Sequence, residues 1–134
     1  MIFSSGKVKL VMKSPINKTK LVVLISNTGI GTILRTIIEG INAGKIKAKI
    51  SAVITDTTNA LGLEYARKNN LKIEICKIKE ALLPLLQKLN PDYICLAGWK
   101  QIILDKVIFE YPNKILNLHP GLIPDTVEGK AKNP

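Results

Sequence analysis

Aromatic residues and arginine are scarce in this sequence of 134 residues. Aromatic side chains make up 4% of the chain, which has one tryptophan and one histidine. Arg35 and Arg67 are the only arginines. Proteins that bind single-stranded nucleic acid stack the bases on aromatic rings and contact the strand through arginine. This composition therefore argues against a nucleic-acid groove.

Cysteine and long apolar runs are also scarce. The two cysteines, Cys76 and Cys95, lie within apolar stretches and lack the spacing of a metal site, which indicates buried, reduced thiols. No run of about 18 apolar residues is present. Residues 1–13 also lack the apolar core and small-residue cleavage site of a secretory signal. We expect a cytoplasmic protein with no membrane span and no metal.

Acidic residues are outnumbered by basic ones, and the formal net charge is +10. Five lysines and no acidic residue fall within the first twenty positions, so the start of the chain carries half of this excess. The other lysines are spread over predicted helix faces, which is typical of a solvated surface that attracts small anionic substrates. We expect residues 1–19 to be either a basic leader or an edge strand built on residues 8–12.

Short β-branched runs alternate with segments of helical period. The runs typical of strands are residues 20–26, 49–56, 71–75, 93–97 and 115–118. The segments typical of helices are residues 32–43, 59–69, 79–89 and 104–110. This alternation predicts a doubly wound α/β fold with a mostly parallel sheet, formed by residues 20–134 as one domain.

Local signals refine this prediction. The aliphatic run of residues 21–25 is typical of a strand buried on both faces, so it should be central in the sheet. We expect Gly44 to cap the first helix, Asn59 to start the second, and Asn90 with Pro91 to end the third.

The turn after the first predicted strand, residues 26–32, contains two glycines and opens onto a helix. In a doubly wound sheet, ligands bind at the carboxyl ends of the strands. Glycines let backbone N–H groups approach an anion, and the helix N-terminus adds partial positive charge, so the turn suits a phosphate. It matches neither a dinucleotide fingerprint nor a P-loop, and a tight turn also needs glycine for its geometry. Both interpretations stay open.

The fourth predicted strand leads through Ala97 and Gly98 to Trp99, the only tryptophan. Small residues followed by apolar side chains would line a flat pocket for a planar heteroaromatic ring. The alternative is that Trp99 belongs to the core, and the sequence alone favours this alternative.

Asn117 and His119 stand two residues apart at the end of the fifth predicted strand. Alternate residues of a strand share a face, so the carboxamide and the imidazole would converge on one atom. An amide donates to a developing oxyanion, and histidine transfers protons or carries charge near neutral pH. A structural histidine next to a turn asparagine would give the same spacing.

Three fragments together resemble a known family. Residues 21–26, 96–99 and 115–124 are similar, in order and spacing, to phosphoribosylglycinamide formyltransferases, folate-dependent enzymes of purine synthesis. The similarity runs from about Lys20 to Pro124 and covers the N-terminal half or more of that family's domain. The Asn-x-His-Pro element is shared with other 10-formyltetrahydrofolate enzymes, including methionyl-tRNA formyltransferase. The glycine-containing first turn favours the ribonucleotide enzyme.

The resemblance implies a site, a reaction and a Rossmann-like formyltransferase fold. The residues that it assigns are Gly31, Thr32 and Ile33 to the substrate phosphate, Trp99, Lys100, Gln101, Ile102 and Ile103 to the folate, and Asn117 and His119 to catalysis. The implied reaction transfers a formyl group from 10-formyltetrahydrofolate to the amine of glycinamide ribonucleotide. Folate is then a co-substrate, and no permanently bound cofactor or metal is implied.

The sequence departs from the family pattern at three places. Ile33 stands where asparagine is usual, and Gly121 where serine is common, followed by Asp125 and Thr126. The family's catalytic aspartate lies some tens of residues beyond the histidine, past Pro134. We therefore expect a fragment of a longer reading frame, with the C-terminal part of the fold missing, that is catalytic only if the full-length frame supplies this aspartate. Two alternatives remain: a non-catalytic nucleotide- or folate-binding module, and a fragment of a methionyl-tRNA formyltransferase-like enzyme.

Overall fold

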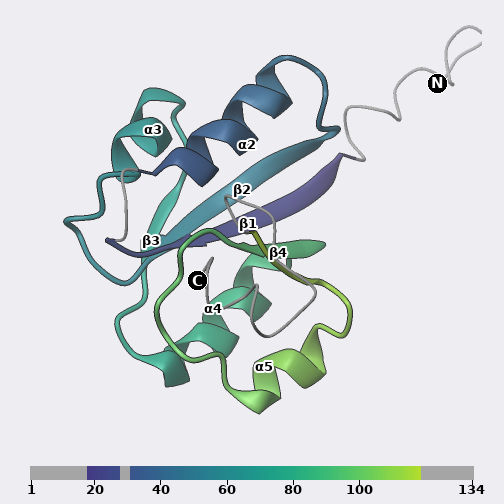
Figure 1. The fold of residues 1–134 in the computed structure, drawn as a ribbon. Helices are drawn as coiled ribbons and strands as arrows, with labels where there is room; N and C mark the ends of the chain where they lie inside the picture. Colours follow the sequence, from purple (N-terminus) through teal and green to yellow (C-terminus); the bar gives the residue numbers. More distant parts are fainter. Residues whose placement is uncertain (1–17, 28–30, 119–134) are drawn as a thin grey trace, which may run out of the picture.

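A computed structural model describes residues 18–27 and 31–118, which form a five-stranded parallel sheet with helices on both faces (Figure 1). The strands, in the spatial order β3-β2-β1-β4-β5, are β1 (Thr19–Ile25), β2 (Ala48–Thr55), β3 (Ile73–Ile75), β4 (Tyr93–Leu96) and β5 (Ile115–Asn117). Every pairing between these strands is parallel. The predicted doubly wound α/β fold is therefore confirmed.

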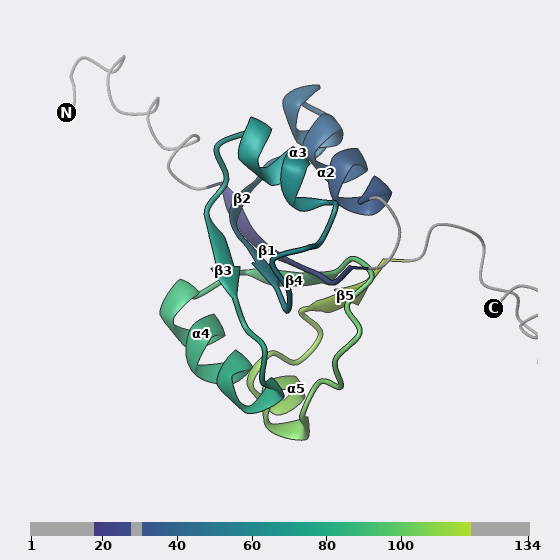
Figure 2. The same ribbon diagram turned by 90° about the vertical axis from the view of Figure 1, so that its left-hand side faces the viewer.

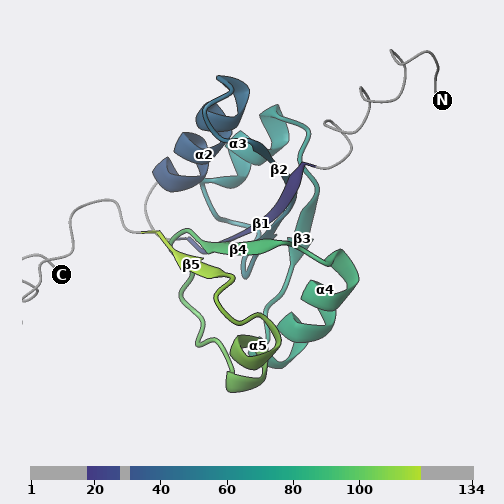
Figure 3. The ribbon, with the colours of Figure 1, turned by 90° about the vertical axis from the view of Figure 1, so that its right-hand side faces the viewer.

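Two helices cover each face of the sheet. The helical elements are α2 (Thr32–Asn42), α3 (Leu63–Lys68), the 3-10 turn η1 (Lys79–Ala81), α4 (Leu82–Leu89) and α5 (Asp105–Glu110). Helices α2 and α3 lie on one face, and α4 and α5 on the other (Figures 2 and 3). The chain runs outward from β1 to β2 and β3, then returns to place β4 on the other side of β1. The strand order thus reverses between β1 and β4.

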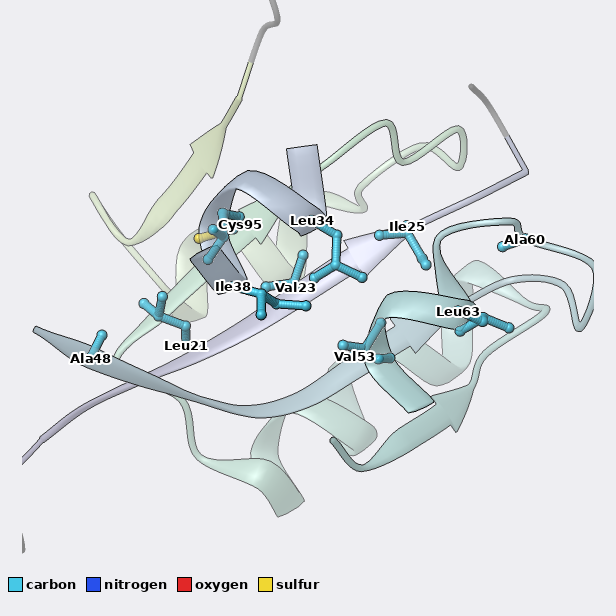
Figure 4. Packing of buried hydrophobic residues seen from close by; sticks show 12 residues of the cluster. Leu21, Val23, Ile25, Leu34, Ile38, Ala48, Val53, Ala60, Leu63 and Cys95 are labelled. Atoms are coloured by element: carbon cyan, nitrogen blue, oxygen red, sulfur yellow. The ribbon is translucent and has the colours of Figure 1, made fainter. Parts of the chain in front are cut away.

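Strand β1 is the centre of the hydrophobic core, as its continuous aliphatic sequence predicts. Leu21, Val23 and Ile25 pack toward α2 and α3 (Figure 4), whereas Val22 and Leu24 pack toward α4 and α5. All five side chains are at most 8% exposed. Because successive residues of a strand point to opposite faces, one apolar run supplies both layers of the core.

Two of the predicted helix ends are confirmed. Gly44, with φ +77°, follows the C-cap residue of α2, and Asn90 ends α4 in the left-handed conformation with φ 49°. The strand ends differ from the prediction by at most two residues, and the largest difference is at the start of β3, Ile73. Residues 79–81 form a 3-10 turn before α4, so the third predicted helix is α-helical only from Leu82.

The predicted start of the second helix at Asn59 is wrong. Helix α3 begins at Leu63, because the preceding segment forms a polar turn at the end of β2. The Thr55 hydroxyl donates to the Thr57 carbonyl at 2.7 Å, and the Asn59 N–H donates to the Thr57 hydroxyl at 3.2 Å. Threonine hydroxyls compete in this way with helical hydrogen bonds.

Both cysteines are buried and unpaired, as the sequence indicates. Cys95 packs in the layer under α2 and α3, and Cys76 in the layer under α4 and α5. Within the described ranges, no helix is long and apolar enough to cross a bilayer. The leader or edge strand expected of residues 1–19 falls almost entirely outside these ranges, since only Lys18 and Thr19 are described and Thr19 already belongs to β1.

Candidate functional site

The carboxyl edge of the sheet brings together four segments that lie far apart in the sequence. Strand β1 leads into Ser26 and Asn27, β2 into Asp56, and β4 into the connection that contains Lys100, while β5 ends at Asn117. Ligands of doubly wound folds bind outside the carboxyl ends of the strands, where the strand order reverses. The reversal between β1 and β4 therefore marks this edge as the candidate site.

The N-terminus of α2 lies at this edge. Gly31 is its N-cap residue, with φ +83° and ψ 22°, a left-handed conformation that glycine adopts without strain. Thr32 and Ile33 are the first helical residues, and the N-cap glycine itself has no side chain that could cap the helix. Gly31 also contacts Gly62, the N-cap residue of α3, so closely that a Cβ atom would not fit between them. The predicted phosphate-binding residues thus lie together at the start of α2, which packs against the start of α3.

Lys100, in the connection after β4, donates two hydrogen bonds to the residues that follow β1. The Lys100 N–H donates to the Ser26 hydroxyl at 3.0 Å, and the Lys100 ammonium group donates to the Asn27 side-chain oxygen at 3.0 Å. The neighbouring Gln101 side-chain amide donates to the Asp56 carboxylate at 3.4 Å. The predicted folate segment is therefore joined to the strand that leads into the predicted phosphate turn.

The side chains of the predicted folate segment divide into two groups. Trp99 and Ile103 pack against the core beneath α4 and α5, and the indole N–H of Trp99 has no hydrogen-bond partner among the described residues. Lys100 and Ile102 are exposed, Ile102 by 70%, and Gln101 is half-buried. Trp99 thus has the contacts expected of a core residue, which is the alternative to a role in ligand binding. Lys100, Gln101 and Ile102 are at least partly exposed to solvent.

Asn117 is the last residue of β5, and its side chain is exposed. It is in register with Leu96 of β4, and the following N–H, that of Leu118, donates to the Leu96 carbonyl at 3.0 Å. These bonds fix the backbone of Asn117 beside the end of β4. His119, the other predicted catalytic residue, lies outside the described residues.

Sequence reasoning did not single out the pair formed by Ser26 and Asp56. The Ser26 hydroxyl donates to the Asp56 carboxylate at 3.0 Å and joins the ends of β1 and β2. Ser26 is only 4% exposed, which is unusual for a serine outside regular secondary structure. The sequence does contain one indication of this pair, namely that each of the two residues directly follows a run typical of a buried strand.

A groove of about 180 Å³ lies away from this edge. Its lining includes Ile38 and Ile41 of α2 and Lys49 near the start of β2. The groove sits toward the amino end of β2, opposite the segments that carry the candidate polar groups. The carboxyl edge therefore remains the better candidate, since it combines a strand-order reversal with a helix N-terminus. Within residues 18–27 and 31–118, no three His, Cys, Asp or Glu side chains gather as metal ligands.

The strand order and the glycine N-cap of α2 at the carboxyl edge define a doubly wound α/β protein. The sequence profile of the formyl transferase family matches residues 19–130. The chain belongs to this family.

Several relatives of named function are similar to most of the chain. Phosphoribosylglycinamide formyltransferase of Haemophilus influenzae is 38% identical over 119 residues, which cover 78% of this chain and 53% of that protein. The crystal structure of glycinamide ribonucleotide transformylase 1 from Symbiobacterium toebii matches with a TM-score of 0.73 and 32% identity over 86% of this chain and 58% of the other. Phosphoribosylglycinamide formyltransferase from Brucella melitensis matches with a TM-score of 0.72 and 31% identity over 82% and 61%. The chain spans about half the length of the curated relatives from Haemophilus influenzae and Escherichia coli.

Proposed function

We propose that this protein transfers a formyl group from 10-formyltetrahydrofolate to the amine of glycinamide ribonucleotide. The observation that carries the proposal is the meeting of three segments at one sheet edge in a chain of the formyl transferase family. These are the helix start at Gly31, the connection at Lys100 and the strand end at Asn117. The relatives named for this reaction have the same fold.

The ribonucleotide phosphate would bind at the N-terminus of α2. Backbone N–H groups of Thr32 and Ile33 point out of the first turn of a helix, where the helix dipole favours negative charge. This mode of binding uses the backbone, so it tolerates an apolar side chain at Ile33. The left-handed Gly31 lets the chain turn tightly into the helix and leaves the anion close access.

The folate would bind against the connection after β4. Lys100, Gln101 and Ile102 offer a cationic, an amide and an apolar group that remain accessible, and Trp99 with Ile103 anchors the connection in the core. A planar heteroaromatic ring with polar edges needs this combination of apolar contact and a few placed polar groups. The folate is consumed as a co-substrate, and the proposal includes no resident cofactor.

The chemistry would take place beside Asn117. The substrate amine attacks the formyl carbon, and the carbonyl oxygen gains negative charge that the Asn117 carboxamide and protonated His119 stabilise. The attacking amine loses a proton, the tetrahedral intermediate collapses with cleavage of the bond from the formyl carbon to N10, and N10 gains a proton, so that no net proton is consumed. Tetrahydrofolate and the formylated amine result.

A cytoplasmic location is part of this proposal, with small molecules as the binding partners. The support for the location is that Cys76 and Cys95 are buried and unpaired, as in proteins of reducing compartments.

The test is a steady-state assay of glycinamide ribonucleotide formylation, combined with calorimetric titration of each substrate. Turnover that depends on both substrates supports the proposal. Binding of either ligand without any turnover would favour a non-catalytic binding module instead. Absence of both binding and turnover would refute the assignment of this edge as the substrate site.

A further inference from the structure

A hydrogen-bonded network connects the ends of β1 and β2 to the connection after β4. Its centre is the Ser26 hydroxyl, which accepts from the Lys100 N–H at 3.0 Å and donates to Asp56 Oδ2 at 3.0 Å. Gln101 donates to the same carboxylate oxygen at 3.4 Å. Asp56 therefore holds two consecutive residues of the connection, one directly and one through Ser26.

Asp56 is itself fixed by the turn that follows β2. Thr55 is fully buried, and its hydroxyl donates to the Thr57 carbonyl at 2.7 Å and accepts from the Thr57 N–H at 3.2 Å. These two bonds close the backbone around Asp56. The Asp56 carboxylate thus belongs to a hydrogen-bonded turn, which fixes its position relative to its partners, Ser26 and Gln101.

Residues 99–103 of the connection after β4 take their polar contacts from the ends of β1 and β2. This segment follows Gly98, which turns with φ +82°, and within the described part of the chain its polar partners are Ser26, Asn27 and Asp56. Removal of the Asp56 carboxylate would leave the Ser26 hydroxyl, which is 4% exposed, without its acceptor. It would also release the Gln101 side chain.

We propose that Asp56 is a positioning residue that holds Lys100 and Gln101 in place, directly and through Ser26, so that the folate-binding segment is preformed before the ligand arrives. The role of the segment in folate binding rests on the proposed function; the positioning itself does not. A segment that is already ordered loses less conformational entropy when the ligand binds, so the affinity for the folate depends on this network.

The only tryptophan of the chain, Trp99, is adjacent to Lys100 and reports on the segment directly. Acrylamide quenching of its fluorescence is measured in the full chain without any substrate. We expect Asp56→Ala to raise the quenching constant about twofold, because local opening exposes the indole. Asp56→Asn retains an oxygen that accepts from Ser26 and Gln101, so it should restore the value of the unmodified protein.

Two further variants complete this experiment. Asp92→Ala is the matched control, because Asp92 accepts from the Lys20 N–H at 2.8 Å at the opposite end of the sheet, and quenching should be unchanged. Ser26→Ala removes the same link with a small change in volume and should raise quenching as Asp56→Ala does. The double variant should add little to either single change, since both break one network. Quenching in Asp56→Ala equal to that of the unmodified protein would overturn the proposal.

The kinetic part separates the positioning role from the proposed function. For an active protein, Asp56→Ala should raise KM for 10-formyltetrahydrofolate about tenfold and leave kcat within about twofold, because it removes binding common to the ground and transition states. A loss of kcat with KM unchanged would contradict the positioning role. A protein without turnover would refute the proposed function, and the quenching result would still decide whether Asp56 holds the segment.

Discussion

Gly31 and Gly62 touch through their backbones: a methyl group added at Gly31 would lie 2.5 Å from the Cα atom of Gly62. The two glycines are the N-cap residues of α2 and α3, so the starts of both helices meet at this point. The Arg35 guanidinium, 5.8 Å from the centre of the Tyr65 ring, adds a second contact between the same helices. The geometry of the candidate phosphate site therefore depends on how α3 packs.

The first prediction concerns this contact. Gly31→Ala should lower the free energy of unfolding by about 3 kcal/mol, because alanine is strained at φ +83° and its Cβ collides with Gly62. Gly44→Ala is the matched control: Gly44 has a similar φ of +77°, but a Cβ there meets nothing within 4 Å. The control should lose only about 1 kcal/mol, from backbone strain alone. Urea unfolding measures both, and equal losses would show that the close approach is unimportant.

The second prediction concerns the central strand. Leu24 is completely buried in β1, so Leu24→Ala should lower the free energy of unfolding by about 2–5 kcal/mol through lost burial and a residual cavity. Ile78, which is 62% exposed, provides a control of similar size, and Ile78→Ala should change stability by less than about 0.5 kcal/mol. Urea unfolding again provides the measurement. A small effect at Leu24 would contradict the central position of β1.

The central strand could be predicted from the sequence because a strand that is buried on both faces is a continuous run of apolar residues. Residues 21–25 are all aliphatic, and the structure places them between two layers of helices. The start of α3 could not be predicted in this way, since Asn59 is a good helix start in isolation but is used by the turn around Thr57.

The candidate site was only partly predictable for a related reason. Gly31 and Asn117 stand out through local patterns, namely a glycine before a helix and an amide at a strand end. The bond between Ser26 and Asp56 joins residues 30 positions apart, and no local pattern encodes it. It follows from the register of β1 with β2, in which Ile25 pairs with Thr55, and this register is set by packing of the whole sheet.

The third prediction concerns the pH dependence of stability. Burial raises the pKa of the Cys95 thiol, and burial is also the main cause of the raised pKa of Cys76, to which the charge of Asp56 contributes. In the unfolded chain a thiol ionises near pH 8.5, and in the folded chain it ionises at higher pH. The folded state therefore retains protons that the unfolded state releases, so stability is full below about pH 8 and falls as the pH rises further.

Urea unfolding at intervals from pH 7 to 9.5 tests this prediction. The double variant Cys76→Ala with Cys95→Ala should be less stable at every pH, because it loses buried volume, but its stability should decline less over this range. Tyr111, whose pKa is raised by burial and by Glu110, contributes only at higher pH. An equal decline in the double variant would show that the thiols are not responsible.

The fourth prediction concerns Asn117. If its carboxamide stabilises the oxyanion, Asn117→Ala should lower kcat about 10²- to 10³-fold and change KM for either substrate little, because that hydrogen bond forms in the transition state. The side chain is exposed, so the free energy of unfolding should change by less than about 0.5 kcal/mol, and the loss of kcat cannot then come from misfolding. Asn42→Ala is the matched control, since Asn42 is an exposed asparagine at the far end of α2, where it contacts Asn69. Steady-state formylation assays compare the two variants, and a normal kcat in Asn117→Ala would remove this residue from the catalytic assignment.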